Sequence, residues 1–262
     1  MNLAPRFARS DEAPLDPIAV ARALHARFDI RAPNEIAIEL MAWHCGARVL
    51  YRPAGSADAR VVRAGDRAIL AIAESARGTP RARFSIAHEL AHFLLHADFD
   101  AIARIHGEPR TSHREFKVER EADRFASEAL LPWSLAAPMC EGVTPTLDAV
   151  GDLARAFDVS LSVAGQKWAR NARGGCAYVE SRGGVIRRAR RSDGFRGVAV
   201  ERRKLEEGTL ALELERAGGE GGKRVHARAW GSAQAGGEIV EECVTLGDGS
   251  AGGAVLTWLS HG

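Results

Sequence analysis

The residues with the clearest chemical potential form one short segment, His88-Glu89-Leu90-Ala91-His92. Residues four apart lie on the same face of a helix, so His88 and His92 can both reach one tetrahedral Zn²⁺, with Glu89 beside the position left open for water. This HExxH spacing is typical of a hydrolytic metal site in which the glutamate is the general base. The structural alternative is a pair of stacked surface histidines that bind no metal.

A catalytic zinc site needs a third protein ligand, which must come from further along the chain. His96 lies eight residues after His88, about 12 Å along a helix axis, too far to share the ion; we interpret it as structural or as a partner of a ligand. Glu119 and Asp123 share one face of a second predicted helix. We expect Glu119 to bind the metal and Asp123 to accept the other ring N–H of a ligand histidine. Glu121 points about 200° away and is the alternative ligand, and a solvated acidic helix face is the structural alternative.

These residue types predict a mechanism. Zinc lowers the pKa of a bound water to about 7 and polarises the scissile carbonyl, while Glu89 takes the proton of the water and delivers it to the leaving amine. Intrinsic affinity favours Zn²⁺ over Mn²⁺ at such a site, and Mn²⁺ is the alternative in the cell. A Tyr or His donor often completes oxyanion stabilisation, but the sequence gives no basis for choosing among Tyr51, Tyr178 and His113.

The first half of the chain predicts helices around a small sheet. Asp16 as N-cap and Pro17 at the first position begin a helix that reaches Phe28. Strand 67–73 precedes the HExxH helix, and we expect a sheet edge there to pair with an extended substrate. The other expected elements are a helix from near Asn34 to Gly46, strands at 47–52 and 60–63, a turn at Gly65-Asp66, and helices at 81–96 and 113–131.

Residues 146–171 predict two short helices separated by Asp158-Val159, which resemble a helix-turn-helix. Ser162, Gln166 and Arg170 on the second helix are the residues that would face DNA. This segment has no concentrated basic face, so direct DNA binding is disfavoured. The alternatives are that the two helices complete the fold or dock a protein partner.

Glycine content changes near Arg173, because 8 of the 27 glycines lie in residues 1–173 and 19 lie in the last 89 residues. Period-two alternation predicts strands at 209–215 and 224–230, with one helix near 198–207. These features predict a separate α+β domain. In this domain we interpret Cys176 and Cys243 as buried apolar side chains rather than oxidant sensors. We interpret the basic run of Arg187, Arg188, Arg190 and Arg191 as a solvated strand or turn.

Composition limits the remaining function classes. The chain has 262 residues, of which 46% are hydrophobic and 27% charged, which excludes collagen-like and wholly disordered proteins. A formal net charge of +2 gives no global electrostatic argument for nucleic acid or membrane partners. Four scattered cysteines without a CxxC pair, and the lack of an apolar leader or spanning stretch, predict a cytoplasmic protein in a reducing compartment.

Two segments carry a resemblance to a known family. RFSIAHELAHFLLH at 83–96 and EREADRFASEALLP at 119–132 are similar to the ImmA/IrrE metallopeptidase family, and the resemblance covers residues 15–172. It implies a gluzincin-like His/His/Glu site with His88, His92 and Glu119 as metal ligands and Glu89 as the catalytic residue. All four positions match the family pattern.

The resemblance also implies a domain order and a substrate. It implies an α+β chain with a zincin-like metallopeptidase domain at 1–132, a helix-turn-helix-like segment at 133–172 and a GAF-like regulatory domain at 173–262. This order is similar to that of a radiation-response regulator of the family. Known members cleave helix-turn-helix repressors, so the implied function is site-specific zinc proteolysis of a repressor of DNA-damage genes.

Two other function classes compete with this one. The first is a DNA-binding transcriptional activator without proteolysis, in which the HExxH helix is only structural. The second is another metal hydrolase such as a deformylase, which is disfavoured because deformylases use a cysteine in an EGC-type motif, whereas this chain has Cys140-Glu141-Gly142. The ligand or signal of the C-terminal domain cannot be named from these residues.

Overall fold

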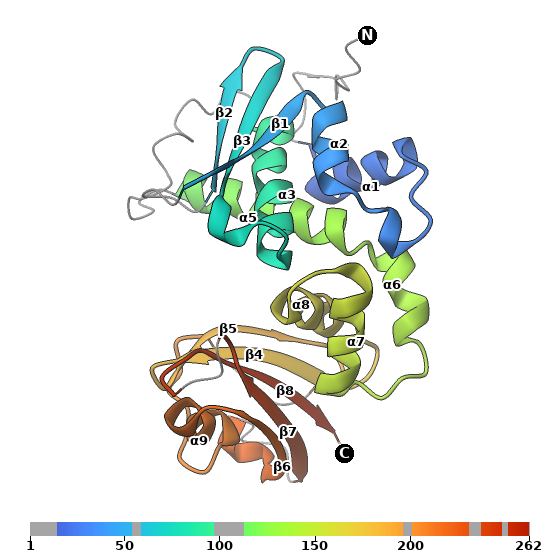
Figure 1. Ribbon diagram of the computed structural model, residues 1–262. Helices are drawn as coiled ribbons and strands as arrows, with labels where there is room; N and C mark the ends of the chain where they lie inside the picture. Colours follow the sequence, from blue (N-terminus) through green and yellow to red (C-terminus); the bar gives the residue numbers. More distant parts are fainter. Residues whose placement is uncertain are drawn as a thin grey trace. The chain divides into compact units, whose positions relative to one another are not determined.

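The computed structural model describes residues 15–53, 59–96, 113–195, 201–230, 237–247 and 251–261. The fold is α+β, as predicted, and divides into two compact units: Met1–Ala136 with Ala156–Ser160, and Ala137–Arg155 with Leu161–Gly262. The predicted division at residues 132 and 172 stays a prediction. The elements of Figure 1 are α1 (Pro17–Arg27), the 3-10 helix η1 (Pro33–Glu35), α2 (Ile38–His44), β1 (Ala47–Arg52), β2 (Ala59–Ala64), β3 (Arg67–Ala73), the 3-10 helix η2 (Glu74–Ala76), α3 (Pro80–Leu95), α5 (His113–Leu130), α6 (Trp133–Cys140), α7 (Leu147–Phe157), α8 (Leu161–Asn171), β4 (Cys176–Arg182), β5 (Val185–Arg191), α9 (Leu210–Ala217), β6 (Glu220–His226), the 3-10 helix η3 (Ala227–Trp230), β7 (Glu238–Thr245) and β8 (Val255–His261).

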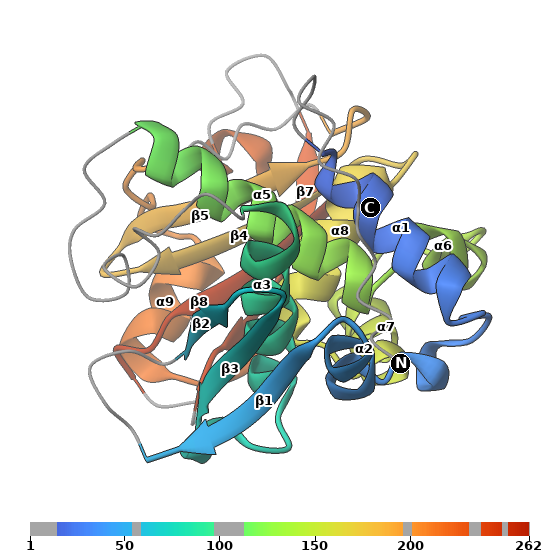
Figure 2. The same ribbon diagram turned by 90° about the horizontal axis from the view of Figure 1, so that it is seen from above.

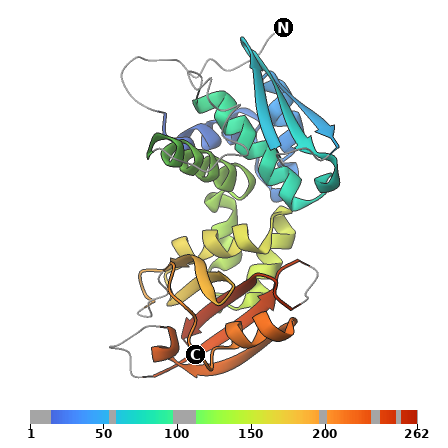
Figure 3. The ribbon, with the colours of Figure 1, turned by 90° about the vertical axis from the view of Figure 1, so that its left-hand side faces the viewer.

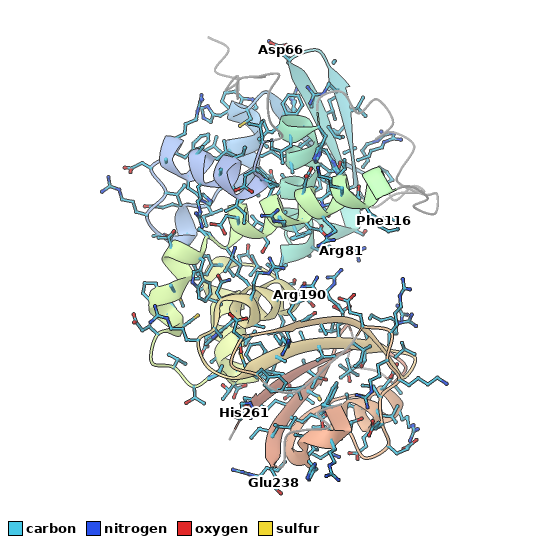
Figure 4. All side chains as sticks on the ribbon, turned by 180° about the vertical axis from the view of Figure 1, so that it is seen from behind. Asp66, Arg81, Phe116, Arg190, Glu238 and His261 are labelled. Carbon is cyan, nitrogen blue, oxygen red and sulfur yellow. The ribbon has the colours of Figure 1, made fainter. Side chains whose placement is uncertain are left out.

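The sheet of the first unit has the strand order β1-β3-β2. β3 pairs in parallel with β1 and antiparallel with β2, and Asp66 lies at the tip of the β2–β3 hairpin (Figure 4). Our expectation that strand 67–73 offers a sheet edge is therefore wrong. The central strand has hydrogen-bonding neighbours on both sides, so within the described part of this sheet the open edges belong to β1 and β2.

α3 lies between this sheet and α5 in the views of Figures 1 and 2. Its inner positions are buried, including Ile86 and Leu90 at 0% exposure, and α5 contributes Ala122 and Phe125 at 0%. α1 also packs on α5, and there the buried imidazole of His25 lies 2.8 Å from the Ala129 carbonyl oxygen. This packing fixes α5 against α3.

Most predicted N-terminal elements are confirmed. Asp16 accepts a hydrogen bond from the Ile18 N–H as the N-cap of α1, and β3 has the predicted bounds. The helix expected from Asn34 to Gly46 is instead the short η1 followed by α2. α6 is an addition, because the Pro132 carbonyl accepts from Leu135 and Ala136 and so begins a new helix after ending α5.

The second unit contains an antiparallel sheet with the order β5-β4-β8-β7-β6. Figures 1 and 3 show α8 and α9 on opposite faces of this sheet. On the α8 face, Trp168 contacts Trp258 with ring centroids 6.2 Å apart, and a Cβ on Gly165 would lie 2.8 Å from a ring carbon of Tyr178. The second helix of the helix-turn-helix-like segment thus packs on the sheet.

Two predictions for the C-terminal half are wrong, and a third is only partly right. Residues 209–215, expected as a strand, form most of α9, because Leu, Ala and Glu are strong helix formers and Gly218 at φ 76° ends the helix. Of the predicted helix near 198–207, residues 198–200 lie outside the described residues and 201–207 are not helical. The strand predicted at 224–230 ends at His226 and continues as η3. In the part of the chain that the structure describes, no helix is long and apolar enough to cross a membrane.

Candidate metal centre

α3 positions the HExxH segment. It begins with Thr79, whose side chain accepts a hydrogen bond from the Ala82 N–H, and with Pro80 at the first position, an arrangement that favours a helix start. Because the apolar face of α3 is buried against the sheet and α5, Glu89 and His92 are carried inside with it, each at 1% exposure.

Three ligand groups meet between α3 and α5. The two Nε2 atoms of His88 and His92 lie 3.0 Å apart, and the carboxylate of Glu119 lies 3.5 Å from His88 Nε2 and 3.4 Å from His92 Nε2. In the described part of the chain, this is the group of His, Cys, Asp and Glu that could hold a metal ion. Ligands at 2.0 to 2.1 Å from a tetrahedral Zn²⁺ lie about 3.3 Å from one another, so the three groups fit that ion.

Asp123 orients His88. Its Oδ1 lies 3.1 Å from His88 Nδ1, and a carboxylate only accepts, so the Nδ1–H donates to Asp123. In the neutral ring this leaves the Nε2 lone pair directed at the three-ligand centre. Asp123 therefore lies in the position predicted from the sequence for the residue that accepts the other ring N–H of a ligand histidine.

His96 and Glu121 lie on the other side of the centre. His96 Nδ1 is 3.1 Å from His92 Nδ1, and His96 Nε2 is 3.1 Å from Glu121 Oε2. Glu121 therefore contacts His96 and does not enter the group formed by His88, His92 and Glu119. His92 is thus connected through His96 to Glu121, whose side chain is partly exposed.

The electrostatics of the three ligands favour a cation at the centre. Burial opposes the charged form of His88, but hydrogen bonds to Asp123 and Glu119 outweigh it and raise the pKa of His88 to about 10. Burial lowers the pKa of His92 to about 4, against the opposing effect of the Glu119 carboxylate 3.4 Å away. Burial also favours neutral Glu119, but its contacts with the two histidines, at 3.5 and 3.4 Å, hold its pKa well below the usual range.

Glu89 lies beside this group and also contacts the sheet. Burial raises the pKa of Glu89 to about 7, while the positive charge of His88 and a hydrogen bond from the Val61 backbone N–H act in the opposite direction. A carboxylate with a pKa near neutrality is suited to general base catalysis. The contact with β2 is one that sequence reasoning missed, because a backbone donor leaves no signal in the residue type.

The remaining candidate residues have other partners or lie outside the described side chains. The Tyr51 hydroxyl donates to Glu39 at 2.5 Å, the Tyr178 hydroxyl donates to Glu180 at 2.7 Å, and the side chain of His113 lies outside the described residues. No oxyanion donor is assigned. Ser162, expected to face DNA, makes a hydrogen bond with Tyr178.

The two cysteines weighed as oxidant sensors are buried, in agreement with the apolar interpretation. Burial raises the pKa of Cys176 to about 11 and that of Cys243 further above its ordinary value. Both thiols therefore stay protonated at neutral pH, and protonated thiols are poor nucleophiles.

Comparisons with known proteins agree with this geometry. Residues 43–169 match the family described as the IrrE N-terminal-like domain (Peptidase_M78). The "Radiation response metalloprotease IrrE" of Deinococcus radiodurans is 30% identical over 153 residues, which are 57% of this chain and 46% of that protein. The protein of the same name from Deinococcus deserti is 29% identical over 143 residues, or 55% and 50% of the two chains. The chain thus spans about half the length of the curated relatives it matches.

A solved structure extends the likeness in fold beyond the matched domain. The "Mycobacterium tuberculosis transcriptional regulator" has a TM-score of 0.61 and 17% sequence identity, over 93% of this chain and 86% of that chain. Identity at that level concerns the fold alone. The matched segment 43–169 contains the HExxH helix, Glu119 and Asp123, and through this domain the chain is similar to the ImmA/IrrE-type metallopeptidases.

Proposed function

We propose that the chain is a zinc-dependent peptidase that cuts a helix-turn-helix repressor at one site and thereby switches on DNA-damage and radiation-response genes. The observation that carries the proposal is the convergence of His88, His92 and Glu119 within 3.0 to 3.5 Å of one another. The radiation-response part comes from the names of the two Deinococcus relatives.

His88, His92 and Glu119 would hold the ion, and Glu89 would move protons. A bound Zn²⁺ supplies a water of lowered pKa and polarises the peptide carbonyl. The Glu89 carboxylate takes the proton of the attacking water, and the same oxygen then delivers that proton to the nitrogen of the leaving amine as the C–N bond breaks. Its burial beside the ligands keeps the carboxylate within reach of both atoms.

The substrate backbone is expected to pair with β2. β2 has an open edge among the described strands, and Val61 on it donates to Glu89, so a peptide added along this edge would lie next to the general base. Backbone pairing alone does not distinguish one protein from another. Selectivity therefore requires further docking surfaces, for which the helix-turn-helix-like segment at 133–172 is our candidate.

The C-terminal region, 173–262 in the sequence-based division, would regulate this activity as a GAF-like domain. A ligand or partner of that region can change activity only if its affinity differs between active and inactive states of the enzyme. We therefore expect a ligand or partner to bind this region.

A digestion experiment tests the proposal. A purified helix-turn-helix repressor of DNA-damage genes and an unrelated denatured protein are incubated separately with the enzyme, with and without a chelator, and the products are identified by mass spectrometry. One chelator-sensitive cut, in the repressor alone, supports the proposal. Equal chelator-sensitive degradation of both proteins would show a general protease, and the absence of any cut would reject the peptidase.

The variant Glu89→Gln is the internal control for a contaminating protease. Glu74→Gln, at an exposed carboxylate of the same unit that pairs with Arg77, is the matched variant that should still cut. Metal analysis of the purified protein, followed by reconstitution with Zn²⁺ or Mn²⁺, distinguishes the two ions.

A further inference from the structure

The two histidines of the centre are oriented by different means. His88 contacts the Asp123 carboxylate directly, whereas His92 reaches the Glu121 carboxylate only through His96. The spacing explains the difference, because His88 and His92 of α3 and His96, the residue that caps the C-terminal end of α3, follow one another at intervals of four residues, and each contacts the next.

The proton positions along this row follow from the donor inventory. The Glu121 carboxylate only accepts, so His96 Nε2 carries a proton and donates to it. A neutral His96 then has a lone pair on Nδ1. The contact of 3.1 Å between His96 Nδ1 and His92 Nδ1 needs one proton, so that proton belongs to His92 Nδ1 and the lone pair of His92 lies on Nε2.

The opposite arrangement would not bind a metal. A proton on His96 Nδ1 would make His92 Nδ1 the acceptor and place the proton of neutral His92 on Nε2, in the position that faces His88 and Glu119. One carboxylate at the rim therefore sets which nitrogen of a buried imidazole is free. Burial supports the isolation of this row from solvent, since the side chains of His92, His96 and Glu121 are 0%, 7% and 21% exposed.

We propose that His96 and Glu121 are positioning residues that hold His92 as the tautomer with its lone pair on Nε2, before any metal arrives. The inference rests on the proposed metal site but not on peptidase activity. It separates His88 and His92, as metal ligands, from His96, as the residue that orients one of them.

Nitrogen-15 NMR of the full chain with labelled histidine tests the proposal, since two-bond couplings show which ring nitrogen carries the proton. In the metal-free wild type we expect His92 to carry it on Nδ1. His96→Leu removes the acceptor and should give a mixture of His92 tautomers, whereas His96→Asn places an amide oxygen close to the lost Nδ1 and should restore the wild-type pattern. An unchanged His92 tautomer in His96→Leu would overturn the proposal.

Zinc affinity, measured by chelator competition, is the second readout. Loss of a residue that orients a metal-binding histidine costs about 10- to 100-fold in affinity; we expect this for His96→Leu and a smaller loss for His96→Asn. Arg120→Gln, exposed on the same turn of α5 as Glu121, is the matched control and should bind zinc like the wild type. Equal affinities of wild type and His96→Leu would also reject the proposal.

Glu121→Gln keeps the test decisive if His96→Leu does not fold. An amide can donate as well as accept, so it no longer fixes the direction of the proton chain, and the His92 signals should again show both tautomers. Glu121 lies at the rim of the site, where this change removes no buried packing. His92 held wholly on Nδ1–H in this variant would contradict the role of Glu121.

Discussion

Both units of the molecule bury carboxylates, and these carboxylates have different partners in the two units. In the first unit, Glu89 and Glu119 lie beside imidazoles that converge on one point. In the second, the Glu215 carboxylate accepts from the Gly183 and Gly184 N–H groups, and Glu241 accepts from the Ala211 N–H. Burial of a charge therefore does not by itself mark a functional site. Convergence of side chains from two elements does.

The backbone explains why the second unit needs its carboxylates. Gly183 and Gly184 both have positive φ, 65° and 67°, as in the two-residue turn that joins strands of a hairpin. Their N–H groups face Glu215 on α9, so one side chain ties the β4–β5 turn to the helix. Glu241 similarly supplies an acceptor for an N–H in the first turn of α9, where the helix has none of its own.

The contrast between the buried carboxylates of the two units would be lost if Glu89 had only a structural role. Glu89→Gln removes the base without changing the size of the side chain, and we expect the rate of repressor cleavage to fall about 10²- to 10⁴-fold. Bound zinc, measured on the same samples, should be retained. Full cleavage activity in this variant would mean that Glu89, like Glu215, has only a structural role.

Glu119 and Glu121 separate a ligand from its neighbour on one helix. Glu119→Ala should weaken zinc binding by more than about 100-fold, since loss of a supporting residue alone costs 10- to 100-fold. Glu121→Ala should cost less, because Glu121 contacts His96 and not the centre. Chelator competition on the two variants measures both, and a larger loss for Glu121→Ala would exchange their roles.

Glu215 is the corresponding test in the second unit. Glu215→Ala leaves the N–H groups of Gly183 and Gly184 without their acceptor, and we expect the free energy of unfolding of that unit to fall by about 2 kcal/mol. Zinc affinity should not change. Glu213→Ala, on the same helix but in an exposed pair with Lys223, is the control and should lose less than about 1 kcal/mol. Urea unfolding followed by circular dichroism compares them, and equal losses would show that burial of Glu215 is irrelevant.

Protons should compete with zinc only in the first unit. The pKa of His88 is raised to about 10, so below that pH zinc must displace a proton, and zinc binding should strengthen about tenfold per pH unit between pH 7.5 and 9. Calorimetry in buffers of different ionisation enthalpy should show about one proton released per zinc at pH 8. Release of no proton would mean that His88 is neutral before the metal binds.

Much of the first unit could be predicted because its signals are local. Asp16, Thr79 and Pro80 cap or begin helices from within the same few residues, and the HExxH spacing places two histidines on one face of α3 in any context. The central position of β3 could not be predicted, since strand order depends on which segments meet in space. The contact of His96 with Glu121 required the packing of α3 on α5.

The second unit shows where local patterns are ambiguous. The sequence TLALELE alternates as a strand does, yet it consists mainly of helix-forming residues, and it forms most of α9, which packs on β7. The same segment places Ala211 and Glu215 one helical turn apart on the buried side. A period-two pattern of Leu with Ala and Glu therefore needs the helix propensity of its residues weighed before a strand is assigned.

Residues 156–160 belong to the first unit although the segments on both sides of them belong to the second. Within the first unit, Arg83 near the start of α3 donates to the Asp158 main-chain oxygen at 3.1 Å and pairs with its carboxylate at 3.3 Å. If all residues after 136 were replaced by those of another protein, Asp158 would be lost. Its contacts with Arg83 on the helix that carries His88 and His92 would be lost with it. A viable chimaera must bring its own Asp158 equivalent, so the unit that contains the candidate metal centre is not transferable as one uninterrupted stretch of sequence.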